Sequence, residues 1–315
     1  MSAAEAITSG VREEGLLVPA GPVVVMLSGG RDSTCLLDIA VQVCGAAAVT
    51  ALHVNYGLRA SADDDERHCG ELCARLGVEL EVKHVRTRAP GNVQAWAREL
   101  RYDAAARLAL SHAADIAAGH TATDQVEGVL YRLASSPSRR ALLGMRSRDG
   151  NLVRPLLHIT RDQTGAYCRE RSLSWRDDES NDSDAYVRGR VRRTLVPALR
   201  EIHPAAEQNV LAVIETLRAE AEVLDGLVEA ELAGRTEIEL RRLRMLPVAL
   251  ARLIVQRLAD GVAGRPTPGA SRRLDDILAL RDGGSNHIDL RGGVRASVVD
   301  GVLSLDRTPE IAHDP

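Results

Sequence analysis

A six-residue turn between an apolar run and a helical segment constrains this chain more than any other feature. Val23–Leu27 is an unbroken apolar run, which is typical of a buried parallel strand. Residues 34–40 begin a helical pattern, and the turn between the two segments reads Ser-Gly-Gly-Arg-Asp-Ser at 28–33. Glycines let a backbone approach an anion closely, and the amide groups at a helix start favour negative charge. The sequence therefore predicts a phosphate cradle, with Asp32 as the candidate ligand for the Mg²⁺ that accompanies a nucleotide.

This turn differs from the common P-loop, which requires a Gly-Lys pair. Lys83 is the only lysine in the chain, and no glycine precedes it. The six residues instead resemble the S-G-G-x-D-S pattern of the N-type ATP pyrophosphatases, which cleave ATP between its α- and β-phosphates and transfer AMP. The alternative is an ordinary strand-to-helix turn, in which both serines and the aspartate are incidental. The resemblance implies that ATP is held by Ser28, Gly29, Gly30, Arg31, Asp32 and Ser33.

Strand-like and helical segments alternate over roughly the first 200 residues, which predicts an α/β fold with a doubly wound parallel sheet and helices on both faces. Ligands of such sheets bind beyond the carboxyl ends of the strands. The turn at 28–33, His53 with Asn55, and Gly119 with His120 should therefore lie at one edge. Strands are expected at 23–28, 49–54, 80–85 and 115–119, and helices at 32–43, 62–76, 92–112, 122–133, 161–171 and 183–200.

A domain boundary is expected at His203-Pro204. The sequence predicts a catalytic domain over 1–203 and a smaller, mainly helical domain over 204–315 that ends in short strands. The helical patterns beyond the boundary are 205–232, 240–260 and 270–282, and the strand patterns are 287–290, 294–299 and 302–305.

The net charge of −4 is not that of a typical nucleic-acid-binding protein, but the arginines are unevenly spread. Residues 132–154 hold six arginines and one acid, and residues 186–203 hold five arginines and one acid. Such stretches can form a footprint for a polyanion, although solvated surface is the alternative. Arg98 and Arg101 share a helix face and could likewise reach a phosphate or simply cover apolar helix surface.

The five cysteines, without a secretion signal, indicate reduced thiols and a cytoplasmic protein. No apolar run is long enough to span a membrane. The absence of a C-x-x-C pair opposes an iron–sulfur mechanism.

His120, Asp124 and Glu127 have the i, i+4, i+7 spacing of one helical face. Two carboxylates and an imidazole at the mouth of a nucleotide pocket could hold a cationic amino group and accept its proton. An exposed helix face with stabilising charge pairs is the alternative.

Six blocks in this order and spacing resemble one family, the tRNA(Ile)-lysidine synthetases. The match covers about residues 22–205, and the C-terminal segment resembles the family's first C-terminal domain, which binds tRNA. The resemblance implies that ATP adenylates the wobble cytidine of the isoleucine tRNA with a CAU anticodon, and that free L-lysine then displaces AMP. The blocks are 28–33, 53–59, 92–102, 119–127, 143–157 and 178–192.

The resemblance also implies a role for each candidate residue. The backbone near His53 and Asn55 would line the adenosine. Asp124 and Glu127 would hold the lysine ammonium and assist its deprotonation, while His120 and Arg101 would contact the activated intermediate. The implied tRNA contacts are Arg98, Arg139, Arg140, Arg154, Arg188 and Arg192.

Tyr56 and Gly189 stand where His and Asn are usual in the family, and residues 135–141 replace an Arg-Gly-rich block. Two other functions stay open. One is another RNA-modifying ATP pyrophosphatase, such as a tRNA thiolase, which the lack of paired cysteines opposes. The other is a nucleotide-binding module without turnover, in which Asp32, Asp124 and Glu127 would be unnecessary. The sequence also leaves open whether two copies form a homodimer.

Overall fold

The computed structural model describes residues 2–57, 61–85, 93–136, 138–176 and 187–309. The chain divides into two compact units, Met1–Glu215 and Thr216–Pro315. The division falls inside helix α10 (Ala206–Leu232) rather than at the helix break around Pro204. Its first turns belong to unit 1 because Val210 and Leu211 pack against the core formed by α5 and the segment after it.

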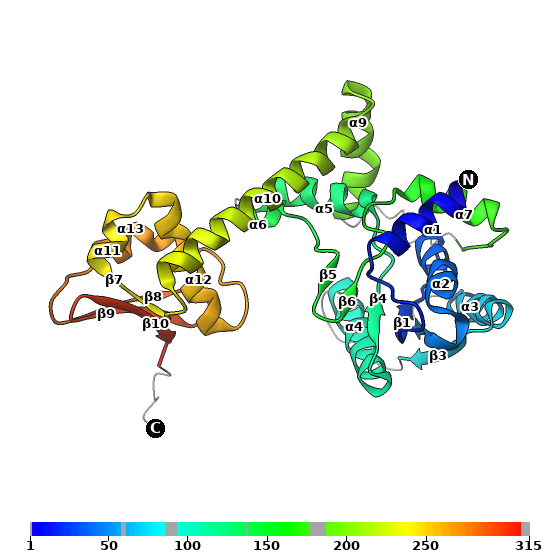
Figure 1. Ribbon diagram of the computed structural model, residues 1–315, viewed down its shortest axis with the longest axis horizontal. Helices are drawn as coiled ribbons and strands as arrows, with labels where there is room; N and C mark the ends of the chain where they lie inside the picture. Colours follow the sequence, from blue (N-terminus) through cyan, green and yellow to red (C-terminus); the bar gives the residue numbers. More distant parts are fainter. Residues whose placement is uncertain (1, 58–60, 86–92, 137, 177–186, 310–315) are drawn as a thin grey trace. The chain divides into compact units, whose positions relative to one another are not determined.

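Unit 1 is built on a six-stranded sheet in the order β3-β2-β1-β4-β6-β5 (Figure 1). All pairs are parallel except β5 with β6. Because β2 and β4 flank β1 on opposite sides, the strand order reverses there, and ligands bind at such a point. The strands are β1 (Val23–Met26), β2 (Val49–Asn55), β3 (Glu79–His84), β4 (Asp115–Ala117), β5 (Arg148–Asp149) and β6 (Leu152–Val153).

Helices cover both faces of this sheet, which confirms the predicted doubly wound α/β architecture. Side chains alternate along β1, so Val23 and Val25 enter one core while Val24 and Met26 enter the other. The first core is closed by α1 (Ala3–Glu13), α2 (Arg31–Cys44), α3 (Ala62–Leu76) and α7 (Arg161–Glu170), and the second by α4 (Val93–His112).

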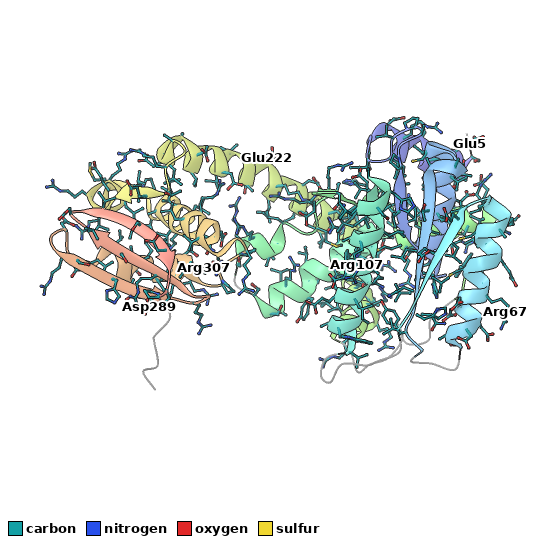
Figure 2. The ribbon with its side chains drawn as sticks, turned by 90° about the horizontal axis from the view of Figure 1, so that it is seen from below. Glu5, Arg67, Arg107, Glu222, Asp289 and Arg307 are labelled. Carbon is teal, nitrogen blue, oxygen red and sulfur yellow. The ribbon has the colours of Figure 1, made fainter. Side chains whose placement is uncertain are left out.

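Figure 2 shows Arg67 of α3 and Arg107 of α4 on opposite sides of the sheet. A short 3₁₀ turn, η1 (Ala46–Ala48), leads into β2.

A third cluster of unit 1 joins α5 to the helices that follow the six-stranded sheet. Val126 and Leu130 of α5 pack against Val191 and Val196. Val191 begins a π-helical turn, and such turns often occur at functional sites. The elements here are α5 (Ala122–Ser135), α6 (Arg139–Leu142), α8 (Val187–Arg190), the π-turn η3 (Val191–Leu195) and α9 (Val196–Ile202).

Unit 2 is mainly helical and ends in short strands, as predicted. Its antiparallel sheet has the order β7-β10-β9-β8. Asp300 and Gly301 form the two-residue connection between β9 and β10, and both have the positive φ that such a tight hairpin requires. The elements are β7 (Glu237–Glu239), α11 (Leu240–Met245), α12 (Val248–Ala263), η4 (Ala270–Arg273), α13 (Leu274–Leu278), β8 (Ser285–Leu290), β9 (Val294–Val299) and β10 (Val302–Arg307).

The helical pattern expected over 240–260 is broken at Leu246-Pro247, because proline ends a helix at the preceding residue. Among the residues that the structure describes, no helix is long and apolar enough to cross a membrane.

Candidate active site

The predicted phosphate turn joins β1 to α2 at the carboxyl edge of the sheet. Gly30 is the N-cap of α2, and no side chain caps this helix, so the amide groups of its first turn are available to an anion. Gly29 has a φ of +80°, and a Cβ at this position would lie 3.2 Å from Cys69 Sγ. Glycine is therefore required at position 29 for both conformation and space.

Ser28 and Ser33 stabilise the turn through hydrogen bonds within it. Ser33 Oγ donates a hydrogen bond to Gly30 O at 2.9 Å, and Ser28 N donates to Ser33 Oγ at 3.2 Å. The two hydroxyl oxygens lie 3.0 Å apart. The serines thus hold the backbone in shape in addition to any contact with phosphate.

Asp32 lies in the first turn of α2 and is held by a residue that the sequence did not point to. Thr164 of α7 is fully buried and donates from Oγ1 to Asp32 Oδ1 at 2.5 Å. Arg31 Nε lies 3.5 Å from the same oxygen. Burial raises the pKa of Asp32, while the Thr164 hydrogen bond and the charges of Arg161 and Arg31 oppose that rise.

His120 lies beside the phosphate turn, but it is not on a helix. A Cβ at Gly119 would lie 3.2 Å from the backbone of Asp32, so the end of β4 packs directly on the turn. The helix α5 begins only at Ala122, with Thr121 as its N-cap. The prediction of one helical face for His120, Asp124 and Glu127 is therefore wrong for His120, because the capping threonine ends the loop after it.

The pKa of His120 is lowered to about 4, and burial is the largest cause. Asp124 opposes this shift, and the positive charges of Arg154, Arg98 and Arg101 add to it. The imidazole is consequently neutral near pH 7.

Asp124 and Glu127 lie on the first two turns of α5, and both carboxylates accept hydrogen bonds from other residues of the chain. Asp124 Oδ2 accepts hydrogen bonds from Thr121 N at 2.8 Å and from Thr121 Oγ1 at 2.9 Å, which completes a capping box. Glu127 is only 2% exposed, which excludes the exposed-face alternative for this residue.

Glu127 forms a two-point ion pair with Arg192 of η3. Arg192 Nε donates to Oε1 at 2.6 Å and Nη2 donates to Oε2 at 2.9 Å, while Asp124 Oδ1 lies 3.8 Å from Nη2. Burial raises the pKa of Glu127 even though the Arg192 guanidinium opposes the shift. Asp124 and Glu127 therefore form a partly desolvated acid pair that already contacts the guanidinium of Arg192.

The backbone near His53 and Asn55 is expected to line the adenosine, and the side chains of both residues are buried and hydrogen-bonded. His53 Nδ1 lies 3.0 Å from Leu27 O, which links the ends of β1 and β2. Asn55 Nδ2 donates to Asp63 Oδ1 at 3.1 Å and to Glu66 Oε2 at 2.7 Å. A hollow of about 400 Å³ adjoins this point and is lined by Asn55, Gly57, Asp63, His84 and Val85.

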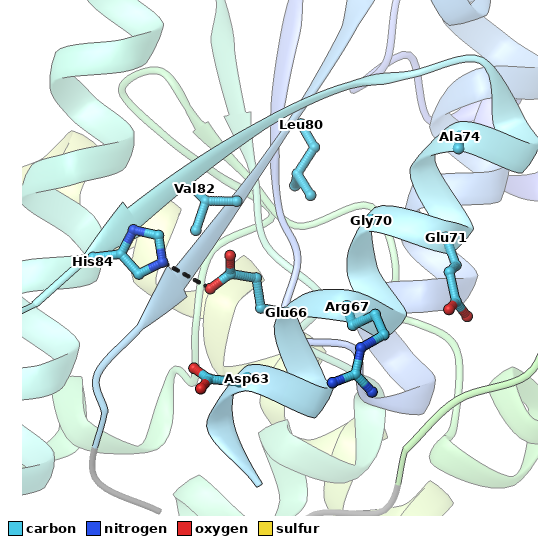
Figure 3. A pocket seen from close by; sticks show the side chains of 9 residues that line it. All are labelled: Asp63, Glu66, Arg67, Gly70, Glu71, Ala74, Leu80, Val82 and His84. Atoms are coloured by element: carbon cyan, nitrogen blue, oxygen red, sulfur yellow. Dashed lines mark hydrogen bonds and ion pairs between the residues drawn. The ribbon is translucent and has the colours of Figure 1, made fainter.

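A larger hollow of about 650 Å³ lies between α3 and β3 (Figure 3). His84 Nε2 and Glu66 Oε2 form a 2.9 Å hydrogen bond across it. It includes none of the residues 28–33, nor His120, Asp124 or Glu127. The candidate active site is therefore located by its chemistry, at the edge where β1 and β4 end, rather than by the size of a cavity.

The residues present fit a nucleotide-bound Mg²⁺ better than a protein-enclosed metal. Within the described part of the chain, no group of three or more His, Cys, Asp or Glu side chains could hold a metal ion. Magnesium in nucleotide sites is usually held by one or two carboxylates together with phosphate oxygens and water. Asp32, beside the phosphate turn, can provide such a carboxylate.

The arginines assigned to tRNA have different surroundings. Arg98 stacks over the Tyr102 ring, with its Cζ 4.8 Å from the ring centroid. Arg154 is buried and donates from Nη1 to Arg146 O at 2.6 Å. Arg192 is engaged with Glu127. Arg139 and Arg140 lie on α6, and Arg188 lies on α8, where its side chain is outside the described set. Residue 92 and residues 178–186, which belong to the blocks 92–102 and 178–192, lie outside the described residues.

The loop that carries several of these arginines is fastened to α5 by Gln125. Its side chain donates from Nε2 to Met145 O at 2.9 Å and accepts from Met145 N at 2.6 Å. A Cβ at Gly144 would lie 2.6 Å from Gln125 Oε1, so this close approach requires glycine.

A family model described as the PP-loop domain matches residues 5–199. The chain is 35% identical over 268 residues to the tRNA(Ile)-lysidine synthase of Gloeobacter violaceus, with 80% of this chain and 81% of that protein covered. It is 36% identical over 254 residues to the enzyme of the same name from Solibacter usitatus, with 77% and 57% covered. The corresponding Thermus thermophilus protein is 33% identical over 300 residues, with 92% and 57% covered.

The chain thus spans 57% of the length of the latter two relatives. Among solved structures, the U34-tRNA thiolase NcsA of Methanococcus maripaludis superposes with a TM-score of 0.58 at 18% identity, covering 68% of this chain and 78% of that one. At that identity the likeness extends to the fold alone.

Proposed function

The chain belongs to the PP-loop family and, within it, to the tRNA(Ile)-lysidine synthases, and from this premise we propose its activity. It ligates L-lysine to the wobble cytidine of the isoleucine tRNA with a CAU anticodon, consuming ATP and releasing AMP and diphosphate. One observation carries the proposal: the buried Glu127 and the half-buried Asp124 lie close to an uncapped phosphate turn, and Glu127 already binds the guanidinium of Arg192. A cytoplasmic location, where tRNA, lysine and ATP are all present, is part of the proposal.

In the first half-reaction, the turn at 28–33 binds the phosphates through the amide groups at the start of α2. The carbonyl oxygen of the cytosine attacks the α-phosphorus, and diphosphate leaves. Asp32 would hold the Mg²⁺, which neutralises charge on the phosphate oxygens. Thr164 orients the Asp32 carboxylate, and Arg161 contributes positive charge nearby.

In the second half-reaction, the ε-amine of lysine attacks the activated ring carbon and AMP leaves. Lysine is mostly an ammonium ion at neutral pH, so it must lose a proton before it attacks. The raised pKa of Glu127 brings this carboxylate closer to the operating pH, which makes it a better general base than an exposed glutamate. His120 and Arg101 would contact the adenylated base.

The lysine ammonium and the Arg192 guanidinium compete for the same oxygens. Arg192 uses both oxygens of Glu127, whereas Asp124 Oδ1 is only approached at 3.8 Å. The substrate ammonium therefore binds first at Asp124, and Arg192 has to release at least one Glu127 oxygen before that group can accept a proton.

A radiolabel assay tests the proposal. The chain is mixed with ATP, labelled lysine and either the isoleucine tRNA or a methionine tRNA, both with a CAU anticodon. We expect lysine-dependent AMP release and incorporation of label into the isoleucine tRNA only, and no AMP from the Asp32→Asn variant. AMP release that ignores lysine would indicate a thiolase-like enzyme, and binding without AMP release would indicate a non-catalytic module.

A further inference from the structure

Residues 173–176 follow α7 and lie against the phosphate turn. Arg176 N donates a hydrogen bond to Gly29 O at 3.0 Å, and Arg176 O lies 3.9 Å from a Cβ built at Gly30. Trp175, the preceding residue, packs against the first core of unit 1. The conformation of the turn therefore depends on a segment that is distant from it in the chain.

The side chain of Arg176 anchors this segment to α3. Its Nε donates to Asp65 Oδ1 at 2.6 Å, and the Asp65 side chain is only 14% exposed. Hydrogen bonds between two charged groups are stronger than those between neutral groups. The helix α3 also packs on the turn, because Cys69 Sγ lies 3.2 Å and the His68 ring 3.5 Å from a Cβ built at Gly29. Gly29 is therefore enclosed by α3 and held at its carbonyl oxygen by the Arg176 backbone.

The hydrogen bond to Gly29 O sets the orientation of the peptide group between Gly29 and Gly30. In a trans peptide the C=O and N–H point in opposite directions, so a carbonyl held by Arg176 directs the Gly30 N–H to the other side. That N–H donates to Ser28 Oγ at 3.3 Å, and Ser28 Oγ lies 3.0 Å from Ser33 Oγ. The Gly30 N–H thus points to the side of the turn that carries the hydroxyl groups, where a phosphate is expected to bind.

A peptide between two glycines can reverse its orientation more easily than other peptides. Neither Gly29 nor Gly30 has a Cβ, so both can reach the φ and ψ values that the reversed peptide requires. Reversal would replace the Gly30 N–H by the Gly29 carbonyl oxygen, which repels phosphate, whereas backbone N–H groups attract it. The contact from Arg176 therefore favours the orientation that binds an anion.

We propose that Arg176 is a positioning residue for the nucleotide: anchored to Asp65, it holds the Gly29–Gly30 peptide with its N–H toward the phosphates of ATP. This inference rests on the proposed function, since it assumes that the turn binds the triphosphate. The guanidinium of Arg176 is engaged with Asp65, and its effect on ATP is transmitted by the main chain. The effect should therefore appear in the affinity for ATP rather than in the later attack of the lysine amine.

The experiment compares Arg176→Gln and Asp65→Asn with a matched control, Arg75→Gln. Arg75 also lies on α3 and also contacts the chain after α7, because its Nη1 donates to Ser172 O at 3.3 Å, but it does not hold the residue that contacts the turn. The affinity for ATP with magnesium is measured by calorimetry, without tRNA or lysine. We expect each of the two variants to bind ATP about 10-fold more weakly, as for the loss of one hydrogen bond to a charged group, and the control to stay within about 2-fold of wild type.

Two further measurements distinguish positioning from a general loss of structure. In AMP formation with saturating tRNA and lysine, Arg176→Gln should raise the KM for ATP about 10-fold, while kcat stays within about 2-fold of wild type. Arg176→Lys keeps a cation beside Asp65 and should restore most of the affinity. Arg176→Pro removes the donating N–H and should weaken ATP binding at least as much as Arg176→Gln.

Arg176→Gln and Asp65→Asn that bind ATP like Arg75→Gln overturn the inference, as does a fall in kcat with an unchanged KM for ATP. Asp65→Asn leaves residues 173–176 unaltered, so it keeps the test valid if Arg176→Gln fails to fold. Either contrary result can occur while the wild-type protein still makes lysidine. Weaker ATP binding by both variants, with no lysine incorporated by the wild-type protein, would overturn the proposed function alone.

Discussion

Arg192 and Glu127 lie 65 residues apart in the chain, and they form a two-point ion pair at 2.6 and 2.9 Å. Glu127 is almost fully buried, whereas the Arg192 side chain remains 28% exposed. The charge of Glu127, which we propose receives the lysine proton, is thus neutralised by Arg192 of the same chain, whose side chain is partly exposed. Substrate binding at this site exchanges one cation for another, which avoids leaving a buried carboxylate without a partner.

Asp124 has two functions that a single substitution can separate. One oxygen caps α5, and the other lies 3.8 Å from Arg192 Nη2, where we propose that the lysine ammonium binds. Asp124→Asn keeps an oxygen for the cap but removes the negative charge, so we expect lysine transfer to fall about 10²-fold while adenylation of the tRNA changes only a few-fold. Single-turnover assays with labelled ATP and labelled lysine measure the two steps separately. Equal losses in both steps would contradict this separation, and an unchanged melting temperature would verify that the cap is intact.

Removing the partner of Glu127 should make stability depend on pH. Without the Arg192 guanidinium, the pKa of Glu127 rises further above its unfolded value. A raised carboxyl pKa contributes stability below the unfolded pKa, and that stability is lost as pH rises through the folded pKa. Arg192→Ala should therefore be destabilised little near pH 5 and by about 3 kcal/mol near pH 8.

Thermal unfolding from pH 5 to 8 measures this effect. The double variant Arg192→Ala with Glu127→Gln removes the titrating group, so its stability relative to wild type should vary much less with pH. A constant destabilisation of Arg192→Ala over the whole range would show that Glu127 does not titrate in the folded protein.

The sequence located β1 to β4 to within about two residues, because each lies in an apolar or alternating segment between two helical patterns. The two-residue strands β5 and β6 are too short to give such a signal, and they form only because β6 pairs with β4. The helix α1 was not predicted, although the sequence carries signals for it. Ser2 and Glu5 have the spacing of a capping box, and the buried residues Ala4, Thr8 and Val11 recur on one helical face.

In the candidate active site, too, the sequence predicts local features but not contacts between distant residues. The turn at 28–33 is local and therefore readable from the sequence. The contact of Thr164 with Asp32 joins residues 132 positions apart, and packing of α7 against α2 creates it. The capping box at Thr160 and Gln163 marks where α7 begins, but nothing in the sequence indicates what α7 contacts.

Thr164 should act as a positioning residue for Asp32. Its hydrogen bond opposes the rise in the pKa of that carboxyl. Thr164→Val has the same shape without the hydroxyl, so the pKa of Asp32 should rise. The acid limb of the pH profile for AMP formation should then shift to higher pH, and the rates should converge with wild type at alkaline pH. Thr164→Ser keeps the hydroxyl and should restore the profile, whereas a uniform loss of rate at every pH would indicate a packing defect instead.

His120 should titrate near pH 4, far below an ordinary histidine, because burial and three neighbouring arginines disfavour its charged form. Nuclear magnetic resonance of the histidine rings over pH 3.5–8 measures this value directly. A depressed pKa stabilises the fold above the unfolded pKa, about 6.5, and this contribution is lost as pH falls through about 4. Arg98→Gln removes one of the positive charges and should move the midpoint upward, while Arg107→Gln, at an exposed position of the same helix, should leave it in place. A midpoint near 6.5 in the wild-type protein would mean that the imidazole is open to solvent and not enclosed by these arginines.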